Sequence, residues 1–287
     1  GTLKSAIEFD YESNSTYIIK VQVRDEHNAS MTESFTVSIT NAYEDTDGDG
    51  FSDQQEIAAG TLLNDPNSKP GLEFGLLGYW PLDGNSSDMS GNGRDGSRHN
   101  GAAFQAGAVG QGLYFDGSND YFSVPIFPMG GEFSISLWAK YDRFRDWDCV
   151  MDFANGSTSQ NLKINMGNSG FTVRGMIFQM MTTDDYRYSG GQYWILNKWV
   201  HTVLTVDKDA TIKGYRSGSL IDTQTGSTFA DSITRNNHWF GKSTWNDNHF
   251  KGKLDEIRLY DRAILAEEAL QLALQGNTTP YDLNSTA

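Results

Sequence analysis

The segment Phe133-Ser134-Ile135-Ser136-Leu137-Trp138-Ala139-Lys140 alternates apolar and polar side chains. Successive side chains of a β-strand point to opposite faces of a sheet, so this alternation predicts a strand with one buried face. The segment Trp199-Val200-His201-Thr202-Val203-Leu204-Thr205-Val206-Asp207 alternates in the same way. Residues 76–82 and 252–260 are also predicted strands, and residues 112–124 are predicted to form a hairpin that turns at Asp116-Gly117. Many short strands at even spacing predict an all-β sandwich.

The composition of the chain limits what kind of protein it is. Its 287 residues are 38% hydrophobic and 13% aromatic, enough for a large core, and 30 glycines suit the many turns of a β protein. The formal net charge of −15 argues against nucleic acid and anionic membranes as partners. No apolar run approaches the ~20 residues of a membrane span. Cys149 is the only cysteine, which excludes an internal disulfide and favours an extracellular bacterial protein over a disulfide-rich animal one.

An acidic loop precedes the predicted sandwich, with the sequence Asp45-Thr46-Asp47-Gly48-Asp49-Gly50-Phe51-Ser52-Asp53-Gln54-Gln55-Glu56. Carboxylates stand at loop positions 1, 3, 5, 9 and 12, glycine stands at position 6, and position 7 can offer a backbone carbonyl. Without a cation these carboxylates would repel one another. We therefore expect Ca2+ here, rather than a solvated acidic loop, with these ligands: Asp45, Asp47, Asp49, Phe51, Asp53 and Glu56.

The residues around this loop indicate what kind of calcium module it forms. Residues 36–40 are predicted as a strand, whereas an EF-hand would have a helix there. Residues 54–59 are predicted as one short helix that ends at Gly60, and an irregular, oxygen-rich stretch follows to residue 70. Residues 45–70 thus resemble a thrombospondin type 3 repeat of bacterial extracellular proteins, present once. The resemblance implies a calcium-stiffened connector between two domains.

The first 44 residues are predicted to contain a hairpin, with strands at 17–25 and 31–40 and a polar turn between them. The elements Phe9-Asp10-Tyr11-Glu12 and Val21-Gln22-Val23-Arg24-Asp25, with the strand ending at Thr40-Asn41-Ala42, resemble the C-terminal half of a cadherin-like repeat. That resemblance makes Asp10, Glu12 and Asp25 candidate calcium ligands, and they are equally well explained as ordinary turn acids. A complete sandwich of this kind needs about seven strands. The segment must therefore pack on the next domain, pair with another copy or remain partly mobile.

The longest resemblance covers about 200 residues. Its pieces are 79–84 with 88–93, 114–121, 133–138, 199–201 and 254–262, followed by a predicted short helix at 264–270 and Gly276. In this order they resemble the laminin-G-like, concanavalin-A-like jelly-roll family of bacterial surface proteins. The expected division is a partial cadherin-like β segment at 1–44, a calcium-loop linker at 45–70, an all-β jelly-roll sandwich at 71–276 and a tail at 277–287.

The same resemblance implies a structural calcium ion near the rim of the jelly roll. Asp88, in the loop Asp88-Met89-Ser90-Gly91-Asn92-Gly93, and Asp255, in the last predicted strand, are the candidate ligands. The alternatives are loop capping by Asp88 and a surface position for Asp255.

Three inserts fall outside the resembling pieces, at residues 141–148, 182–194 and 244–250. They are rich in aromatic rings, which stack on sugars, and in carboxylates, amides and arginines, which bind hydroxyl and carboxylate groups. The alternative for Trp147, Trp194 and Trp245 is a place in the core or as loop anchors. The candidate ligand-binding residues are Arg145, Trp147, Asp184, Asp185, Tyr186, Arg187, Trp245, Asn246, Asp247 and His249.

Signatures of catalysis are weak. Glycosidases of this sandwich class carry two carboxylates on one face of a strand, and Asp146-Trp147-Asp148 offers only a fragment of that pattern. Asp255 and Glu256 are adjacent, so a strand would point them to opposite faces. His201 is better explained as a core or rim residue than as a base. We therefore expect a protein that is not an enzyme.

The sequence as a whole favours a calcium-dependent, extracellular ligand-binding or adhesion module of a large bacterial surface or secreted protein. Its expected partners are a glycan or peptide on a cell surface or matrix, and the neighbouring domains of the same chain. The main alternative is a carbohydrate-binding accessory module of a polysaccharide-degrading enzyme. A divergent hydrolase or lyase, or a spacer without ligand, are the remaining possibilities.

Overall fold

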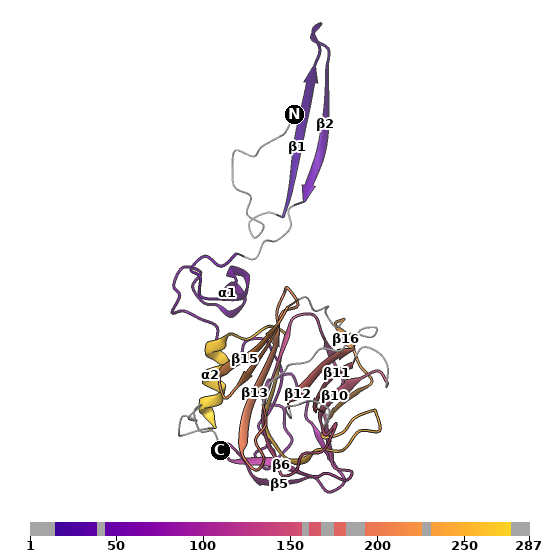
Figure 1. Ribbon diagram of the computed structural model, residues 1–287. Helices are drawn as coiled ribbons and strands as arrows, with labels where there is room; N and C mark the ends of the chain where they lie inside the picture. Colours follow the sequence, from indigo (N-terminus) through magenta and orange to yellow (C-terminus); the bar gives the residue numbers. More distant parts are fainter. Residues whose placement is uncertain are drawn as a thin grey trace. The chain divides into compact units, whose positions relative to one another are not determined.

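The computed structural model describes residues 15–38, 44–156, 161–167, 175–181, 193–225 and 231–276 (Figure 1). The chain divides into two compact units, Gly1–Phe74 and Gly75–Ala287. All the strand pairs described below are antiparallel.

The first unit contains the predicted hairpin, which is confirmed: β1 (Thr16–Arg24) pairs with β2 (Ser30–Ser38). The turn is closed by Asp25, whose Oδ1 accepts the backbone N–H groups of His27 (2.9 Å) and Ala29 (2.8 Å). The register gives the hairpin one largely apolar face and one largely polar face. Residues on the apolar face remain exposed, Met31 at 66% and Phe35 at 47%, so this hairpin has no core of its own among the described residues. The apolar face consists of Tyr17, Ile19, Val21, Val23, Met31, Phe35 and Val37, with Glu33 opposite Val21 as its charged member.

The predicted short helix is also confirmed, as α1 (Asp53–Ala59). Ser52 caps its start: its hydroxyl accepts the N–H of Gln55, and the Gln55 side chain accepts the N–H of Ser52, which forms a capping box. Gly60 ends the helix in the left-handed conformation (φ 76°), which favours glycine. Phe51, just before the cap, is buried and packs edge-on against Phe74. The cap joins the acidic loop to its helix, and the ring contact holds the end of the loop against Phe74.

The second unit is a sandwich of two antiparallel sheets, as predicted. One sheet has six strands in the order β12-β11-β10-β17-β7-β4, and the other has eight, in the order β15-β14-β13-β9-β18-β6-β5 with β3 beside β18. The six-stranded sheet consists of β4 (Ser97–His99), β7 (Tyr121–Ser123), β10 (Cys149–Ala154), β11 (Asn161–Met166), β12 (Met176–Met181) and β17 (Asn237–Phe240). The eight-stranded sheet consists of β3 (Leu76–Trp80), β5 (Ala103–Ala106), β6 (Gln111–Asp116), β9 (Phe133–Tyr141), β13 (Trp199–Val206), β14 (Ile212–Arg216), β15 (Ser219–Gln224) and β18 (Lys251–Tyr260).

Three short elements complete this unit. The strands β8 (Pro128–Met129) and β16 (Ile233–Thr234) pair with each other. The helix α2 (Ala266–Gln275) confirms the predicted C-terminal helix, and Gly276 follows it. Its Glu268 is buried and forms a two-pronged ion pair with Arg262, which attaches the helix to the end of β18.

The predicted hairpin at Asp116-Gly117 is wrong. Although β6 and β7 flank this turn, β6 belongs to the eight-stranded sheet and β7 to the six-stranded one. The buried Asp120 carboxylate holds the corner, because it accepts the N–H groups of Asp116 (2.9 Å) and Gly101 (2.6 Å). The Asp-Gly signal marks a turn correctly but does not say which strands pair on either side.

The core lies between the two sheets. Trp80, Phe122 and Phe240 form a triangle of rings with centroids 6.2–6.4 Å apart. In the six-stranded sheet, Phe153 and Leu162 belong to the core, while their strand neighbours in sequence point to the opposite face. We call that opposite face the outer face of the six-stranded sheet.

Candidate functional site

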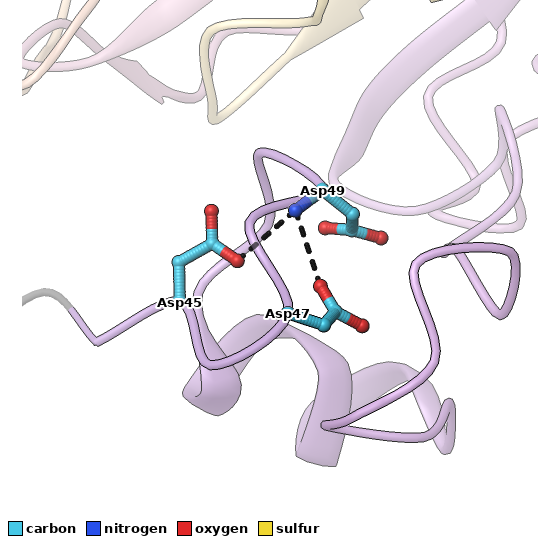
Figure 2. A group of neighbouring side chains, drawn as sticks. All are labelled: Asp45, Asp47 and Asp49. Carbon is cyan, nitrogen blue, oxygen red and sulfur yellow. Dashed lines mark hydrogen bonds between the residues drawn. The ribbon is translucent and has the colours of Figure 1, made fainter.

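The acidic loop gathers three of its aspartates. Oxygen atoms of Asp45, Asp47 and Asp49 lie within 4.8 Å of one another (Figure 2). Asp45 Oδ1 and Asp47 Oδ1 both accept the backbone N–H of Asp49, at 3.2 and 3.1 Å (Figure 2). Asp45 Oδ2 accepts the N–H of Gly50 at 3.0 Å, and Asp49 Oδ1 accepts the N–H of Phe51 at 2.8 Å. The loop backbone therefore places the carboxylates side by side despite their repulsion.

The remaining oxygens of this cluster suit a hard cation. Asp47 Oδ2, Asp49 Oδ2 and Glu56 Oε2 are buried and have no hydrogen-bond partner in the described part of the chain. Burial, and then the charges of Asp47 and Asp49, raise the pKa of Glu56. Buried carboxylate oxygens without donors are costly, and a calcium ion, which takes six to eight oxygen ligands, would remove that cost. The residues present therefore fit the ion that the sequence predicts.

Asp53 has a different role in this loop. Its two oxygens accept the N–H (2.8 Å) and the hydroxyl (2.7 Å) of Thr46. Asp53 thus ties the first residue of α1 to the start of the loop. Position 9 of such loops often reaches the ion through a water molecule, so this brace is compatible with the predicted ligand set.

Asp88 organises its own loop. Its carboxylate accepts the N–H groups of Tyr79 (3.0 Å), Ser90 (2.9 Å) and Arg94 (2.9 Å). Burial opposes ionisation, but these hydrogen bonds outweigh it and lower the pKa of Asp88. The capping role is therefore visible in the geometry, and the role of Asp88 as a calcium ligand stays a prediction.

Asp255 is buried, so the alternative of a surface position for it is wrong. Its Oδ2 accepts the N–H groups of Ala108 (2.8 Å) and Val109 (3.0 Å), while its Oδ1 has no partner among the described residues. Burial raises the pKa of Asp255 to about 7. The neighbouring Glu256 lies at a bulge in β18 and instead binds Arg258 and the hydroxyl of Tyr79. A calcium ion at Asp255 stays a prediction.

The outer face of the six-stranded sheet carries a row of polar and aromatic side chains. Gln179, Lys163, Asp152, Trp239 and Ser123 stand opposite one another on five adjacent strands, β12, β11, β10, β17 and β7. Strands lie ~4.8 Å apart, so the row extends for about 19 Å. Asp152 and Lys163 are charged residues in otherwise largely apolar, buried strands. This was the sequence signal that could have identified them as residues of a functional surface.

The third insert lies against this row. Asp152 Oδ2 accepts the N–H (2.7 Å) and hydroxyl (2.9 Å) of Thr244, and Asp247 forms an ion pair with Lys163. The Lys163 ammonium also lies 5.6 Å from the centroid of the Trp245 ring. Trp245 itself is 36% exposed and Asn246 is exposed. Buried charges thus anchor a loop that presents an aromatic ring and an amide to solvent.

The structure brings the first insert next to the third. The N–H of Cys149 donates to the carbonyl of Asn248 (3.0 Å), and the Asn248 amide donates to the carbonyl of Asp146 (2.7 Å). Trp147, at φ 63°, and His249 are both half-buried near this junction. The His249 pKa is lowered by burial, then by the positive charges of Lys242 and Arg145. Residues about 100 positions apart in the chain therefore form one loop pair.

The second insert is described only at its end. There Trp194 is 4% exposed and packs against Tyr141 with ring centroids 5.4 Å apart, so for Trp194 the core alternative holds. Six candidate residues lie outside the described part of the chain: Asp10, Glu12, Asp184, Asp185, Tyr186 and Arg187.

Two features considered for catalysis have structural roles. His201 is buried, with its Nε2 2.9 Å from the Ser136 hydroxyl, and burial lowers its pKa to about 3. Asp146-Trp147-Asp148 forms a turn rather than a strand, because Trp147 adopts a positive φ, so its carboxylates do not share a strand face. In the described ranges, no helix is both long and apolar enough to cross a membrane.

Comparisons with known families match two parts of the chain. Residues 116–269 match the concanavalin A-like lectin/glucanases superfamily, and residues 45–68 match the bacterial TSP3 repeat. The second match agrees with the connector inferred from the acidic loop, whereas the cadherin-like resemblance of the first 44 residues has no such match. A search of curated proteins found none that matches the chain.

Several solved structures share the fold of the second unit. One is domain 4 of a GH43 extracellular arabinanase from Geobacillus stearothermophilus, in complex with arabinotriose. It is 20% identical with a TM-score of 0.60, and the match covers 69% of this chain and 98% of that chain. Another is the binding domain of Paraclostridial Mosquitocidal Protein 1, which is 18% identical with a TM-score of 0.55. The match covers 71% of this chain and 52% of that chain. A third is the botulinum neurotoxin type G receptor binding domain, which is 14% identical with a TM-score of 0.52. The match covers 69% of this chain and 50% of that chain. The chain thus spans about half of the two toxin domains, and at these identities the likeness concerns the fold.

Proposed function

Because the chain belongs to the concanavalin A-like lectin/glucanases superfamily, we propose that its second unit is a glycan-binding module and not an enzyme. The observation that carries this proposal is the exposed ring of Trp245 above the ion pair of Lys163 and Asp247. An aromatic face beside fixed polar groups is the arrangement that binds a sugar ring and its hydroxyls. Asn246, His249, Arg145 and Trp147 are proposed to line the same site.

The structural neighbours support a binding role. The arabinanase domain was solved with arabinotriose, and the two toxin domains are described as binding or receptor binding domains. Since identities are 20% or lower, these ligands are not transferred to this chain. They favour a binding surface on this fold over a catalytic one.

The acidic loop is proposed to bind calcium and to stiffen the connector that precedes the binding module. Support comes from the TSP3 match and from the unpartnered oxygens of Asp47, Asp49 and Glu56. Bound calcium would convert a self-repelling acidic segment into a rigid joint. We propose an extracellular bacterial setting for the whole chain, in which such joints separate adhesive domains.

The test is a glycan and peptide array, probed with the full chain in millimolar calcium and again with chelator. We expect glycan binding by the unaltered chain and a loss of at least tenfold in affinity for Trp245→Ala. Leu220→Ala is the matched control, because Leu220 is an exposed apolar residue on β15 of the other sheet. Binding to peptides alone, or unchanged affinity in Trp245→Ala, would contradict the proposal. Binding that requires calcium would place the ligand at a metal-supported site.

A second candidate function is an accessory module of a polysaccharide-degrading enzyme. The observation that favours it is the arabinanase domain, which is covered almost completely, at 98% of its length. The domain composition of the complete protein separates the two possibilities: repeated adhesive domains support an adhesin, and a catalytic domain supports an accessory module.

A further inference from the structure

A second group of side chains on the six-stranded sheet belongs to none of the predicted sites. His99 stacks in parallel on Tyr121, with ring centroids 4.1 Å apart, and Tyr121 meets Trp239 edge-on at 5.8 Å. The ammonium of Lys242 lies 4.5 Å from the Tyr121 centroid and 4.3 Å from the Trp239 centroid. All four side chains are half-buried. We call His99, Tyr121, Trp239 and Lys242 the aromatic–lysine platform.

The platform is on the outer face, next to the Trp245 site. Trp239 stands opposite Asp152 in the strand register, and Asp152 stands opposite Lys163. Asp152 also binds Thr244, which directly precedes Trp245. One ligand lying across the strands could therefore meet both groups, since β11 and β17 are separated by only two strand spacings, about 10 Å.

Lys242 is the charged group of the platform. Within the described ranges its ammonium forms no ion pair with a carboxylate, and two ring faces hold it in place. Arg145 and His249 lie in the same electrostatic neighbourhood, as do the carboxylates of Asp116 and Asp120. A cation held between aromatic rings without a carboxylate partner is unusual on a chain of net charge −15. It is poised to accept an anion from solution.

His99 adds a polar group without adding charge. Its Nε2 lies 2.8 Å from the hydroxyl of Ser123, the residue that extends the polar row beyond Trp239. Burial and the charge of Lys242 lower the pKa of His99, so the ring is neutral at neutral pH. The neutral ring and the serine hydroxyl can exchange hydrogen bonds with sugar hydroxyls.

We propose that the platform selects acidic saccharides, in which a carboxylate or sulfate group pairs with Lys242 while the sugar ring lies along Trp239 and Tyr121. The inference rests on the proposed glycan-binding function and deepens it by naming the charge class of the glycan. Trp245 would supply general affinity for sugar rings, and Lys242 would supply the preference for the anionic member of a matched pair.

The test compares oligogalacturonate with its methyl ester, and a sulfated oligosaccharide with its desulfated form, by calorimetry on the full chain. We expect the unaltered chain to bind at least one acidic member about tenfold more tightly than its neutral partner. Lys242→Gln should abolish that ratio, and Lys242→Arg should keep it. Lys213→Gln, on β14 of the other sheet, changes the net charge equally and should leave the ratio unchanged.

The outcomes separate this inference from the proposed function. If acidic and neutral sugars bind equally well and Trp245→Ala still abolishes that binding, the platform is overturned and the proposed glycan-binding function stands. A charge preference that persists in Lys242→Gln would also overturn it. A preference that is lost in Lys242→Gln, together with an affinity that is unchanged in Trp245→Ala, would support the platform and overturn the Trp245 site. Thermal melting of each variant excludes unfolding as the cause.

Discussion

The acidic loop at 45–56 and the outer face of the six-stranded sheet both hold buried charges, and they satisfy them in different ways. On the sheet, Lys163 neutralises Asp247 and acts on the nearby Asp152. Donors from Ser243 and Thr244 bind Asp152 Oδ2, and its Oδ1 has no hydrogen-bond partner among the described residues. In the loop, oxygens of Asp47, Asp49 and Glu56 are left without donors. The sheet thus carries its own counter-charge, whereas the loop holds carboxylates without one and is proposed to take a cation from solution. Four predictions test this difference.

The largest effect is expected at the ion pair on the sheet. Lys163 is almost fully buried, so Lys163→Met would leave Asp247 and Asp152 without their cation. Removing one partner of a buried pair costs about 3–5 kcal/mol of unfolding free energy. Urea denaturation of the full chain should show this loss equally in calcium and in chelator. Lys213→Met is the control, and a loss below about 1 kcal/mol for Lys163→Met would mean that the pair does not sustain the sheet.

The acidic loop should respond to calcium instead. An ion that binds only the folded loop stabilises it by about 2.7 kcal/mol when its free concentration is 100 times its Kd. Titration calorimetry should detect calcium binding to the unaltered chain and a strong loss in Glu56→Gln. Glu73→Gln, an exposed carboxylate of the same unit, is the control. If both variants bind calcium equally well, Glu56 is not a ligand.

The cap of α1 should contribute less than the ion. Ser52→Ala removes the hydroxyl that accepts the N–H of Gln55 and is expected to cost about 1 kcal/mol of helix stability. Because α1 carries Glu56, calcium affinity should fall with it, and saturating calcium should recover most of the loss. Hydrogen exchange of the α1 amides would report this directly. Unchanged exchange in Ser52→Ala without calcium would show that the cap is dispensable.

The smallest expected effect concerns how the stability of the acidic loop depends on pH, which should change sign between chelator and calcium. The pKa of Glu56 is raised above its ordinary value of 4.5, so without metal the folded loop binds protons more tightly than the unfolded chain. In chelator, the contribution of Glu56 to stability is therefore full below pH 4.5 and is lost as the pH rises through the raised pKa. In calcium, protonation competes with the ion, so acidification should destabilise the loop. If the free energy of unfolding has the same slope against pH in chelator and in calcium, the proposed cation dependence is contradicted.

The sequence predicted the acidic loop, α1 and the β1–β2 hairpin well because their determinants are local. The loop ligands fall within twelve consecutive residues, and the helix signals Ser52 and Gly60 lie at its ends. The jelly-roll architecture was also predictable, since its strands alternate and follow the order of a known family. The failure at Asp116-Gly117 has the same explanation, because a turn motif specifies local backbone and not the pairing of its flanking strands.

The sequence by itself determined where charge would concentrate along the chain, several of the strands, and the spacing of carboxylates from which one loop is predicted to bind a hard cation. Only the tertiary structure decided which distant side chains meet. Lys163 and Asp247 are 84 residues apart, and His99, Tyr121, Trp239 and Lys242 come together from three strands and a following loop. Strand register sets these contacts, and register is fixed by the packing of the whole sheet against its core. Short-range patterns carry no record of it.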